Sequence, residues 1–183
     1  GIKFSVPADV VIEKMGDKAT ARQTAVEAGV PVIPGTHGVV ANVTDALKAA
    51  SEIGYPVMIK ASSGGGGRGM RIALSHEDLP GAFQTARAEA MACFGDDRVY
   101  LERFVKDPRH IEIQLLADEH GNVIHLGERD CSIQRRNQKI LEEATSPFAT
   151  PELRLAMGDA AVRLAKHVDY TGVGTIEFLV DTE

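Results

Sequence analysis

Four consecutive glycines, Gly64 to Gly67, constrain this chain more than any other stretch. Glycine loses more backbone entropy on folding than any other residue, so such a run indicates a segment that must move or must approach a ligand closely. Short apolar stretches flank the run at residues 55–60 and 70–74, and both are typical of buried strands. The sequence therefore predicts the order strand, glycine loop, strand.

This order separates the known kinds of phosphate-binding loop. Gly64, Gly66 and Gly69 formally match G-x-G-x-x-G, but the dinucleotide fingerprint requires a helix after its glycines, and a strand follows here. The P-loop motif G-x-x-x-x-G-K-[ST] is absent. In protein kinases the glycine loop precedes the strand lysine, whereas Lys60 stands before this loop. We interpret the loop as a flap over phosphates, with Lys60 and Arg68 supplying charge; a plain surface hairpin is the alternative.

The composition limits the class of protein. The 183 residues are 44% hydrophobic and 25% charged, which suits a globular chain with a buried core. The net charge of −6 argues against a nucleic-acid surface. No apolar run reaches the roughly 18 residues that a membrane span requires. We therefore expect neither nucleic acid nor a membrane as a partner.

The two cysteines, Cys93 and Cys131, lie far apart and form no zinc or redox motif. Reduced thiols are the simplest interpretation, and they indicate the cytoplasm, or the mitochondrial matrix in a eukaryote. Both termini suggest a piece of a longer protein, because the chain begins with Gly1 rather than Met and ends directly after a strand. The expected divisions are residues 1–34 as leading helices and linker, residues 35–104 as a compact unit, and residues 105–183 as a second, truncated unit.

Cap residues and glycines predict five helices. Four of the expected ranges are residues 7–15, 18–28, 44–53 and 151–168. The remaining helix is expected to begin at a cap residue, Ser75, and to end at residue 93. The last of these begins after Thr150, and the apolar stripe predicted for it is Leu153, Ala156, Ala160, Ala161, Leu164 and Ala165.

Three expected strands carry polar residues that suit a binding site. Residues 99–105 include Glu102, whose carboxylate suits the exocyclic amine of a flat heteroaromatic ring; a glutamate in water is the alternative. Apolar and polar residues alternate from His110 to Leu115, and a return strand is expected at 123–128, so one face is titratable or simply solvated. Glu177 interrupts an apolar strand, where a charge favours a metal ligand or an ion pair.

Residues 127–139 are unusually rich in charges and amides. Arg129, Arg135, Arg136 and Lys139 concentrate positive charge in an acidic chain, which indicates a local site for anions held by charge-assisted hydrogen bonds. A salt-bridged surface loop is the alternative.

Together these stretches resemble the ATP-grasp fold, and closely the biotin carboxylase family. The matching segments are residues 15–18, 60–70, 108–112, 128–136 and 174–178, in the family's order and spacing over nearly the whole chain. The resemblance implies an α+β fold in which residues 35–104 form the lid subdomain and residues 105–183 the first part of the core. Many members have histidine where Asn137 stands, and Asn-Gln-Lys looks more like propionyl-CoA carboxylase alpha subunits.

The resemblance also implies roles for particular residues. The ATP-binding set is expected to be Lys18, Lys60, Gly66, Gly67, Glu102, Arg103, Phe104, Val105, His110, Gln134 and Asn137. Lys139 is the expected bicarbonate-binding and catalytic lysine. Glu177 is the expected carboxylate ligand of Mg²⁺ or Mn²⁺. The family's second metal carboxylate, an asparagine and the catalytic arginine belong to a strand beyond Glu183, so this piece is expected to be nearly inactive by itself.

The reaction implied by the resemblance is ATP-dependent carboxylation of biotin with bicarbonate through carboxyphosphate. Expected partners are biotin on a carrier domain and a carboxyltransferase subunit, with a homodimer as the full enzyme and a monomer as the fragment. The alternatives are another ATP-grasp ligase such as the carbamoyl-phosphate type, a nucleotide-binding module without chemistry, and a kinase-like transferase. The final acyl-CoA substrate is not encoded in this stretch.

Overall fold

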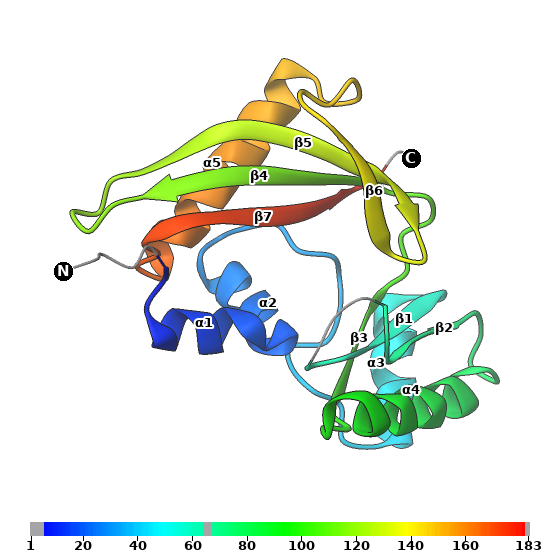
Figure 1. The fold of residues 1–183 in the computed structure, drawn as a ribbon. Coiled ribbons are helices and arrows are strands. Elements are labelled where there is room, and N and C mark those ends of the chain that lie inside the picture. Colours follow the sequence, from blue (N-terminus) through cyan, green and yellow to red (C-terminus); the bar gives the residue numbers. More distant parts are fainter. Residues whose placement is uncertain (1–5, 64–66, 182–183) are drawn as a thin grey trace. The chain divides into compact units, whose positions relative to one another are not determined.

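The computed structural model describes residues 6–63 and 67–181 (Figure 1). Contacts along the chain divide it into two compact units. The three-stranded unit comprises Lys14–Gln23 and Val32–Phe104, and the four-stranded unit comprises Gly1–Glu13, Thr24–Pro31 and Val105–Glu183.

The first two helices are α1 (Asp9–Gly16) and α2 (Lys18–Glu27), close to the predicted ranges. Asp17 caps α2, because its Oδ1 accepts a hydrogen bond of 2.9 Å from the backbone N–H of Thr20. Gly29 follows the helix with a left-handed φ of +68°, a conformation that glycine adopts at little cost.

The three-stranded unit contains an antiparallel sheet of order β2-β1-β3. Its strands are β1 (Val57–Ala61), β2 (Met70–Ala73) and β3 (Val99–Arg103). Because Lys60 pairs with Met70 across the glycine run, the predicted order of strand, glycine loop and strand is confirmed. One sheet face packs on α3 (Val43–Ile53) and α4 (Leu79–Phe94). The core between them includes Ala46, Ala50, Val57, Ile59, Leu79, Phe83, Val99 and Leu101.

The predicted start of α4 at a Ser75 cap is wrong. The Ser75 hydroxyl accepts from the backbone N–H of Asp78 at 3.3 Å in the turn before the helix, which begins only at Leu79. Pro80 explains the shift, since a proline has no N–H to donate and its fixed φ suits the first helical turn.

The four-stranded unit contains an antiparallel sheet of order β6-β5-β4-β7. Its strands are β4 (Arg109–Ala117), β5 (Val123–Arg135), β6 (Gln138–Glu143) and β7 (Gly172–Val180). Helix α5 (Pro151–His167) covers one face, which Figure 1 shows behind β4 and β5. Ile111, Ile113, Leu115, Met157, Ala161 and Ala165 are buried in this core.

The predicted cap of α5 is confirmed, because Thr150 Oγ1 accepts from the backbone N–H of Leu153 at 3.2 Å. The predicted stripe contains one error. Ala156 is exposed and Met157 is buried instead, so the stripe that faces the sheet lies one residue further along in that turn. Alanine is short enough to be tolerated on either face of a helix, which makes it a poor marker of the buried side.

The expected end of the return strand at Glu128 is also wrong, because β5 continues to Arg135. Residues 127–139 form the end of β5, a two-residue turn and the start of β6. Arg136 and Asn137 join β5 to β6 with φ values of +52° and +61°, the two positive angles of a type I′ hairpin turn. The prediction failed because polar side chains suggested that the strand had ended. In the structure, pairing with neighbouring strands provides the backbone hydrogen bonds, and both faces of β5 accommodate charged groups. Asn137 suits its place, since asparagine tolerates the left-handed conformation.

Within the described residues no helix is both long enough and apolar enough to cross a lipid bilayer. Cys93 is exposed, Cys131 is buried, and both are free thiols, as predicted.

Candidate active site

Lys60 and Glu102 form an ion pair on one face of the three-stranded sheet. Lys60 pairs with Tyr100 and Met58 with Glu102, so the lysine and the glutamate are diagonal neighbours on adjacent strands, within reach of long side chains. Glu102 is buried, and its carboxylate accepts from the Lys60 ammonium. The pair therefore fixes the orientation of Lys60, the predicted phosphate-binding lysine.

Lys18 lies in the same unit, and the Asp17 side chain positions the turn that carries it. The backbone N–H of Lys18 donates to the carbonyl of Ser62 at 3.0 Å, and the Ser62 hydroxyl donates to Asp17 Oδ2 at 2.9 Å. Burial alone would raise the pKa of Asp17, but hydrogen bonds from Thr20 and Ser62 outweigh it and lower that pKa. The first turn of α2 is thereby tied to the residue that leads out of β1.

The glycine run is described only in part. The predicted lid residue Gly66 lies outside the described residues, whereas Gly67 and Gly69 have left-handed φ values of +77° and +66°. A Cβ atom on Gly69 would lie 2.8 Å from the Cβ of Ala61. Gly69 is therefore required both by its backbone conformation and by close packing against β1. Arg68, the second predicted phosphate cation, is exposed.

The expected adenine-edge segment, residues 102–105, begins with the last two residues of β3. The backbone N–H groups of Arg103 and Phe104 donate to the carbonyls of Pro34 and Pro56, at 2.7 and 3.0 Å. These two donors are therefore already used inside the chain, which favours carbonyl groups of the segment as its contacts to a ligand. The Arg103 side chain is exposed, and Val105 is half-buried in the four-stranded unit.

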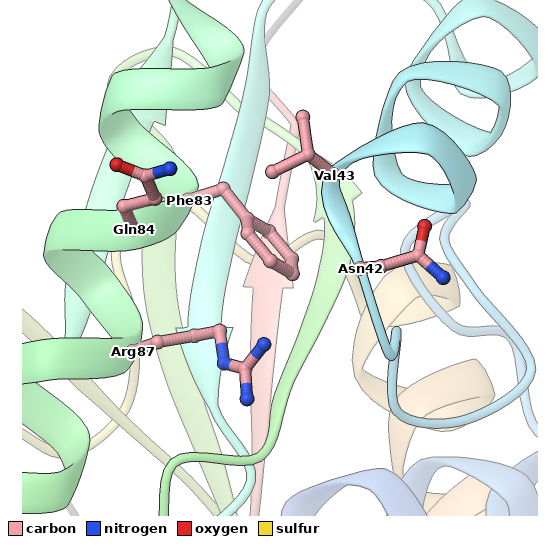
Figure 2. A pocket seen from close by; sticks show the side chains of 5 residues that line it. All are labelled: Asn42, Val43, Phe83, Gln84 and Arg87. Carbon is pink, nitrogen blue, oxygen red and sulfur yellow. The ribbon is translucent and has the colours of Figure 1, made fainter.

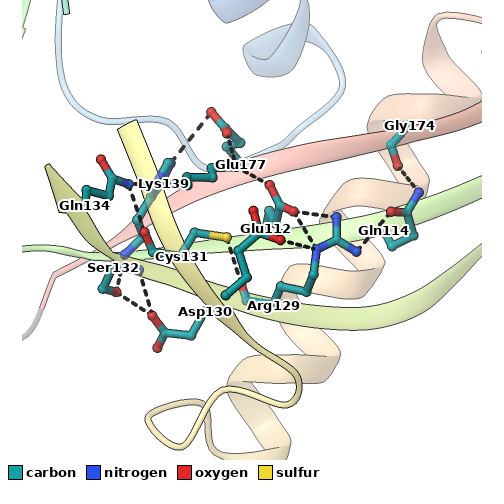
Figure 3. A network of polar contacts seen from close by, with 12 residues as sticks. Glu112, Gln114, Arg129, Asp130, Cys131, Ser132, Gln134, Lys139, Gly174 and Glu177 are labelled. Atoms are coloured by element: carbon teal, nitrogen blue, oxygen red, sulfur yellow. Dashed lines mark hydrogen bonds and ion pairs between the residues drawn. The ribbon is translucent and has the colours of Figure 1, made fainter. Parts of the chain in front are cut away.

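A row of charged side chains crosses the four-stranded sheet (Figure 3). Glu112 on β4 pairs in register with Glu177 on β7 and with Arg129 on β5. Glu112 accepts from Arg129 Nε at 2.6 Å and also forms an ion pair with Lys139 on β6. Lys139 in turn contacts Glu177 Oε1 at 2.7 Å. Two carboxylates therefore hold Lys139 between them.

The charges in this row stabilise one another. Burial would raise the pKa of Glu112, but Lys139 and Arg129 outweigh it and lower that pKa. Burial would likewise lower the pKa of Lys139, but Glu112 and Glu177 raise it. The nearby His110 ring, together with Lys139, lowers the pKa of Glu177 to about 2. Lys139 is therefore a fixed cation at neutral pH, suited to holding an anion.

Glu177 differs from its prediction in one respect. The strand that carries it alternates between half-buried and exposed residues, and the Glu177 side chain is 52% exposed rather than set in an apolar interior. One oxygen contacts Lys139 and the other lies 3.6 Å from His110 Nε2, which agrees with the ion-pair alternative. An accessible carboxylate also fits Mg²⁺, which binds proteins through one or two carboxylates and keeps positions for phosphates and water.

A second group of possible metal ligands, Glu112, Cys131 and Glu142, fits a cation less well. Burial raises the pKa of the Cys131 thiol to about 11, so the thiolate that binds metals is disfavoured. The carboxylate of Glu112 is already shared between Arg129 and Lys139.

His110 and Gln134 meet beside the charged row. Gln134 Nε2 lies 2.5 Å from His110 Nδ1 and donates to the Cys131 carbonyl at 2.9 Å. The structure thus brings together four predicted site residues of this unit, namely His110, Gln134, Lys139 and Glu177. Asn137 has no contact with these four residues among those that the structure describes, and it is exposed in the hairpin turn.

Three residues of the network were not singled out as site residues by the sequence. In the sequence, Glu112 and Gln114 are only two of the polar residues that alternate with apolar ones from His110 to Leu115. Arg129 is only one of several cations in residues 127–139. Gln114 accepts from Arg129 Nη1 at 3.0 Å and donates to the Gly174 carbonyl at 2.8 Å, so it orients Arg129 against β7. The usable signal was the alternation itself, which places all these polar groups on one face.

A separate shallow pocket lies in the three-stranded unit between the N-terminus of α3 and α4 (Figure 2). It is lined by Asn42, Val43, Phe83, Gln84 and Arg87. The Arg87 guanidinium lies 5.8 Å from the centre of the Phe83 ring and pairs with Asp97. No residue of the predicted ATP or bicarbonate sites lines it.

Comparison with known proteins supports the predicted fold. A biotin carboxylase–β-γ-ATP complex from Campylobacter jejuni superimposes with a TM-score of 0.95 at 49% identity, over 99% of this chain and 41% of that one. A biotin carboxylase domain of 2-oxoglutarate carboxylase from Hydrogenobacter thermophilus, solved with MgADP and bicarbonate, gives 0.94 at 50% identity, over 100% and 40%. The predicted α+β ATP-grasp fold is confirmed.

Sequence comparison agrees. The chain is 60% identical to biotin carboxylase 2, chloroplastic, of Populus trichocarpa, over 99% of this chain and 34% of that protein. It is 55% identical to the propionyl-CoA carboxylase alpha chain of Ruegeria pomeroyi, over 99% and 27%. The chain thus spans about a third of the length of these curated relatives. Residues 17–183 match the sequence model of the carbamoyl-phosphate synthase L chain, ATP-binding domain, and the chain belongs to that family.

Proposed function

We propose that this chain is the ATP-binding part of a biotin carboxylase, which uses ATP and bicarbonate to carboxylate biotin through carboxyphosphate. The observation that carries the proposal is Lys139, held as a cation between Glu112 and Glu177 on an open sheet face. The names of the relatives support the proposal, since biotin carboxylases at up to 60% identity match nearly the whole chain.

The proposed roles of the residues follow from their charges. Lys18 and Lys60 bind the ATP phosphates, and Glu102 keeps Lys60 oriented until they arrive. Lys139 holds bicarbonate, and Arg129 beside it adds positive charge to the same face. Transfer of a phosphoryl group requires positioning and neutralisation of charge rather than a protein nucleophile, and fixed cations provide both.

Glu177 is the proposed ligand of Mg²⁺ or Mn²⁺. Its carboxylate would hold the metal, and the metal would neutralise negative charge on the phosphates. The other proposed nucleotide-binding residues are His110, Gln134, Asn137, Gly66, Gly67 and residues 102–105. A glycine lid has a clear purpose here, because carboxyphosphate is destroyed by water.

We further propose that the acceptor is biotin on a carrier domain, that a carboxyltransferase subunit uses the product, and that the full enzyme is a homodimer. The two free thiols support a reducing compartment, either the cytoplasm or an organelle such as the mitochondrial matrix. A carbamoyl-phosphate type of ligase is the second candidate, because the matching family is named for that enzyme and bicarbonate suits Lys139 in both reactions.

The test is ATP cleavage by a longer protein that carries this chain, with and without bicarbonate and free biotin. We expect cleavage to require bicarbonate and to rise with biotin, and Lys139→Gln to abolish the rise. Lys166→Ala, an exposed lysine at the end of α5, is the matched control and should leave activity unchanged. Bicarbonate-dependent cleavage that ignores biotin would favour the carbamoyl-phosphate type, and binding without cleavage would favour a module without chemistry.

A further inference from the structure

Strand β5 departs from regular pairing just beside the charged row. Its ladder with β4 reaches as far as the pair of Ile111 and Asp130, and its ladder with β6 shifts register between Asp130 and Ile133 and again before Gln134. Irregularities of this kind bend a strand and re-aim its side chains, and they are common next to active sites.

Ser132 replaces a ladder bond at this point. Its hydroxyl oxygen accepts a hydrogen bond of 3.0 Å from the backbone N–H of His110, on the neighbouring strand β4. The same hydroxyl donates to Asp130 Oδ1 at 2.5 Å, and the backbone N–H of Ser132 donates to that oxygen at 3.0 Å. Ser132 therefore has a fixed orientation, in which its lone pair faces His110.

Asp130 anchors this arrangement from the protein interior. The residue is buried, and its second oxygen, Oδ2, accepts from the hydroxyl of Ser146 at 2.9 Å. Ser146 Oγ also accepts from the backbone N–H groups of Phe148 and Ala149, at 3.2 and 3.3 Å. Asp130 thus joins the irregular part of β5 to the loop that follows β6.

The irregular segment also determines where Gln134 lies. Its amide nitrogen donates to the carbonyl of Cys131, inside the irregular segment, and the same nitrogen lies against His110 Nδ1. Figure 3 shows Asp130, Ser132 and Gln134 along this short path on β5. His110 is therefore positioned twice, through its backbone by Ser132 and through its ring by Gln134.

We propose that Asp130 and Ser132 are positioning residues of the nucleotide site, which aim His110 and Gln134 by locking the irregular segment of β5. Neither residue need touch the ligand. The role of His110 and Gln134 in binding nucleotide rests on the proposed function above, whereas the positioning of their side chains does not.

The test compares three variants of the 183-residue chain. Ser132→Ala removes the acceptor of the His110 N–H, and Ser132→Thr keeps a hydroxyl at the same place. Ser146→Ala is the matched control, which removes the hydroxyl on the other side of Asp130 together with its bonds from Phe148 and Ala149. NMR signals of the His110 amide and ring and of the Gln134 side-chain amide report the positioning. Calorimetry with Mg-ATP reports its consequence.

We expect Ser132→Ala to shift the His110 and Gln134 signals and to weaken Mg-ATP binding about tenfold, the scale of one lost hydrogen bond. Ser132→Thr should restore both, and Ser146→Ala should lower the melting temperature with little change in either. Unmoved His110 signals in Ser132→Ala, or equal shifts in Ser146→Ala, would overturn the proposal. If Ser132→Ala does not fold, Asp130→Asn replaces it, with the same two readouts and the same expected direction.

The two proposals fail in different ways. Shifted signals in a chain that binds no Mg-ATP would uphold the positioning and contradict the nucleotide site. Normal Mg-ATP binding with unmoved signals in Ser132→Ala would uphold the nucleotide site and contradict the positioning.

Discussion

Replacing Glu112 by glutamine removes the one buried charge on which two site cations depend. The Glu112 side chain is 5% exposed and bonds to both Arg129 and Lys139. A glutamine oxygen still accepts from Arg129, but the amide nitrogen then faces the Lys139 ammonium, so a donor meets a donor. The cations lose their shared counter-ion, while each keeps a second partner in Gln114 or Glu177.

The size of the effect follows from burial. Breaking a fully buried ion pair costs about 3–5 kcal/mol. Here Arg129 and Lys139 retain 28% and 27% exposure, so water recovers part of their solvation. We therefore expect Glu112→Gln to lower the free energy of unfolding by about 2 kcal/mol at pH 7. Glu142→Gln is the matched control, because the Glu142 side chain is 41% exposed and its 3.5 Å contact to Arg129 should be worth less than about 1 kcal/mol.

The pH dependence provides a second check on the same residue. The pKa of Glu112 is lowered in the folded state, so its ionised form stabilises the fold above the ordinary pKa of 4.5, and this contribution is lost as pH falls through the folded value. The difference between wild type and Glu112→Gln should therefore shrink below about pH 4.5. Urea unfolding followed by circular dichroism measures both, since the chain has no tryptophan. A variant as stable as wild type at pH 7, or a difference that does not depend on pH, would refute the reasoning.

Two further predictions concern the metal and the glycine loop. Lys139→Gln should tighten Mn²⁺ binding severalfold, as measured by electron paramagnetic resonance, because Glu177 loses a competing cation 2.7 Å away; weaker binding would contradict the assignment of Glu177. Gly69→Ala should destabilise the chain by about 1–3 kcal/mol, since it combines a positive φ with a Cβ 2.8 Å from that of Ala61. Gly38→Ala, which meets nothing within 4 Å, is its control in thermal unfolding, and equal stability of the two variants would be evidence against the close packing.

The sequence predicted the local features of the fold well where a single residue type determines them. The cap at Thr150 and the glycine that ends α3 at Gly54 are both in place. The cap at Ser75 was wrong because a downstream proline, rather than the serine, decides where α4 begins. Local signals compete, and propensity alone does not rank them.

Non-local pairing explains what the sequence could not predict about the site. Glu112 is buried in an inner strand, and its partners Arg129 and Lys139 come from later strands. Glu177 is exposed although its neighbours in sequence are apolar, because its strand alternates across a sheet with one open face. The register between strands brings these groups together. That register cannot be predicted from a single sequence when polar residues continue past the expected end of β5. The Asp130 and Ser132 contacts depend on the same register.

Calorimetric titration of Mg-ATP into the 183-residue chain tests the central claim most directly, which is that Lys60 and its neighbours form a nucleotide site. Lys60→Ala is the informative variant, and Lys48→Ala, an exposed lysine on α3 of the same unit, is the matched control. We predict saturable binding to wild type and to Lys48→Ala, and at least tenfold weaker binding to Lys60→Ala. Equal affinity in both variants, or no binding to a folded wild-type chain, would contradict the claim.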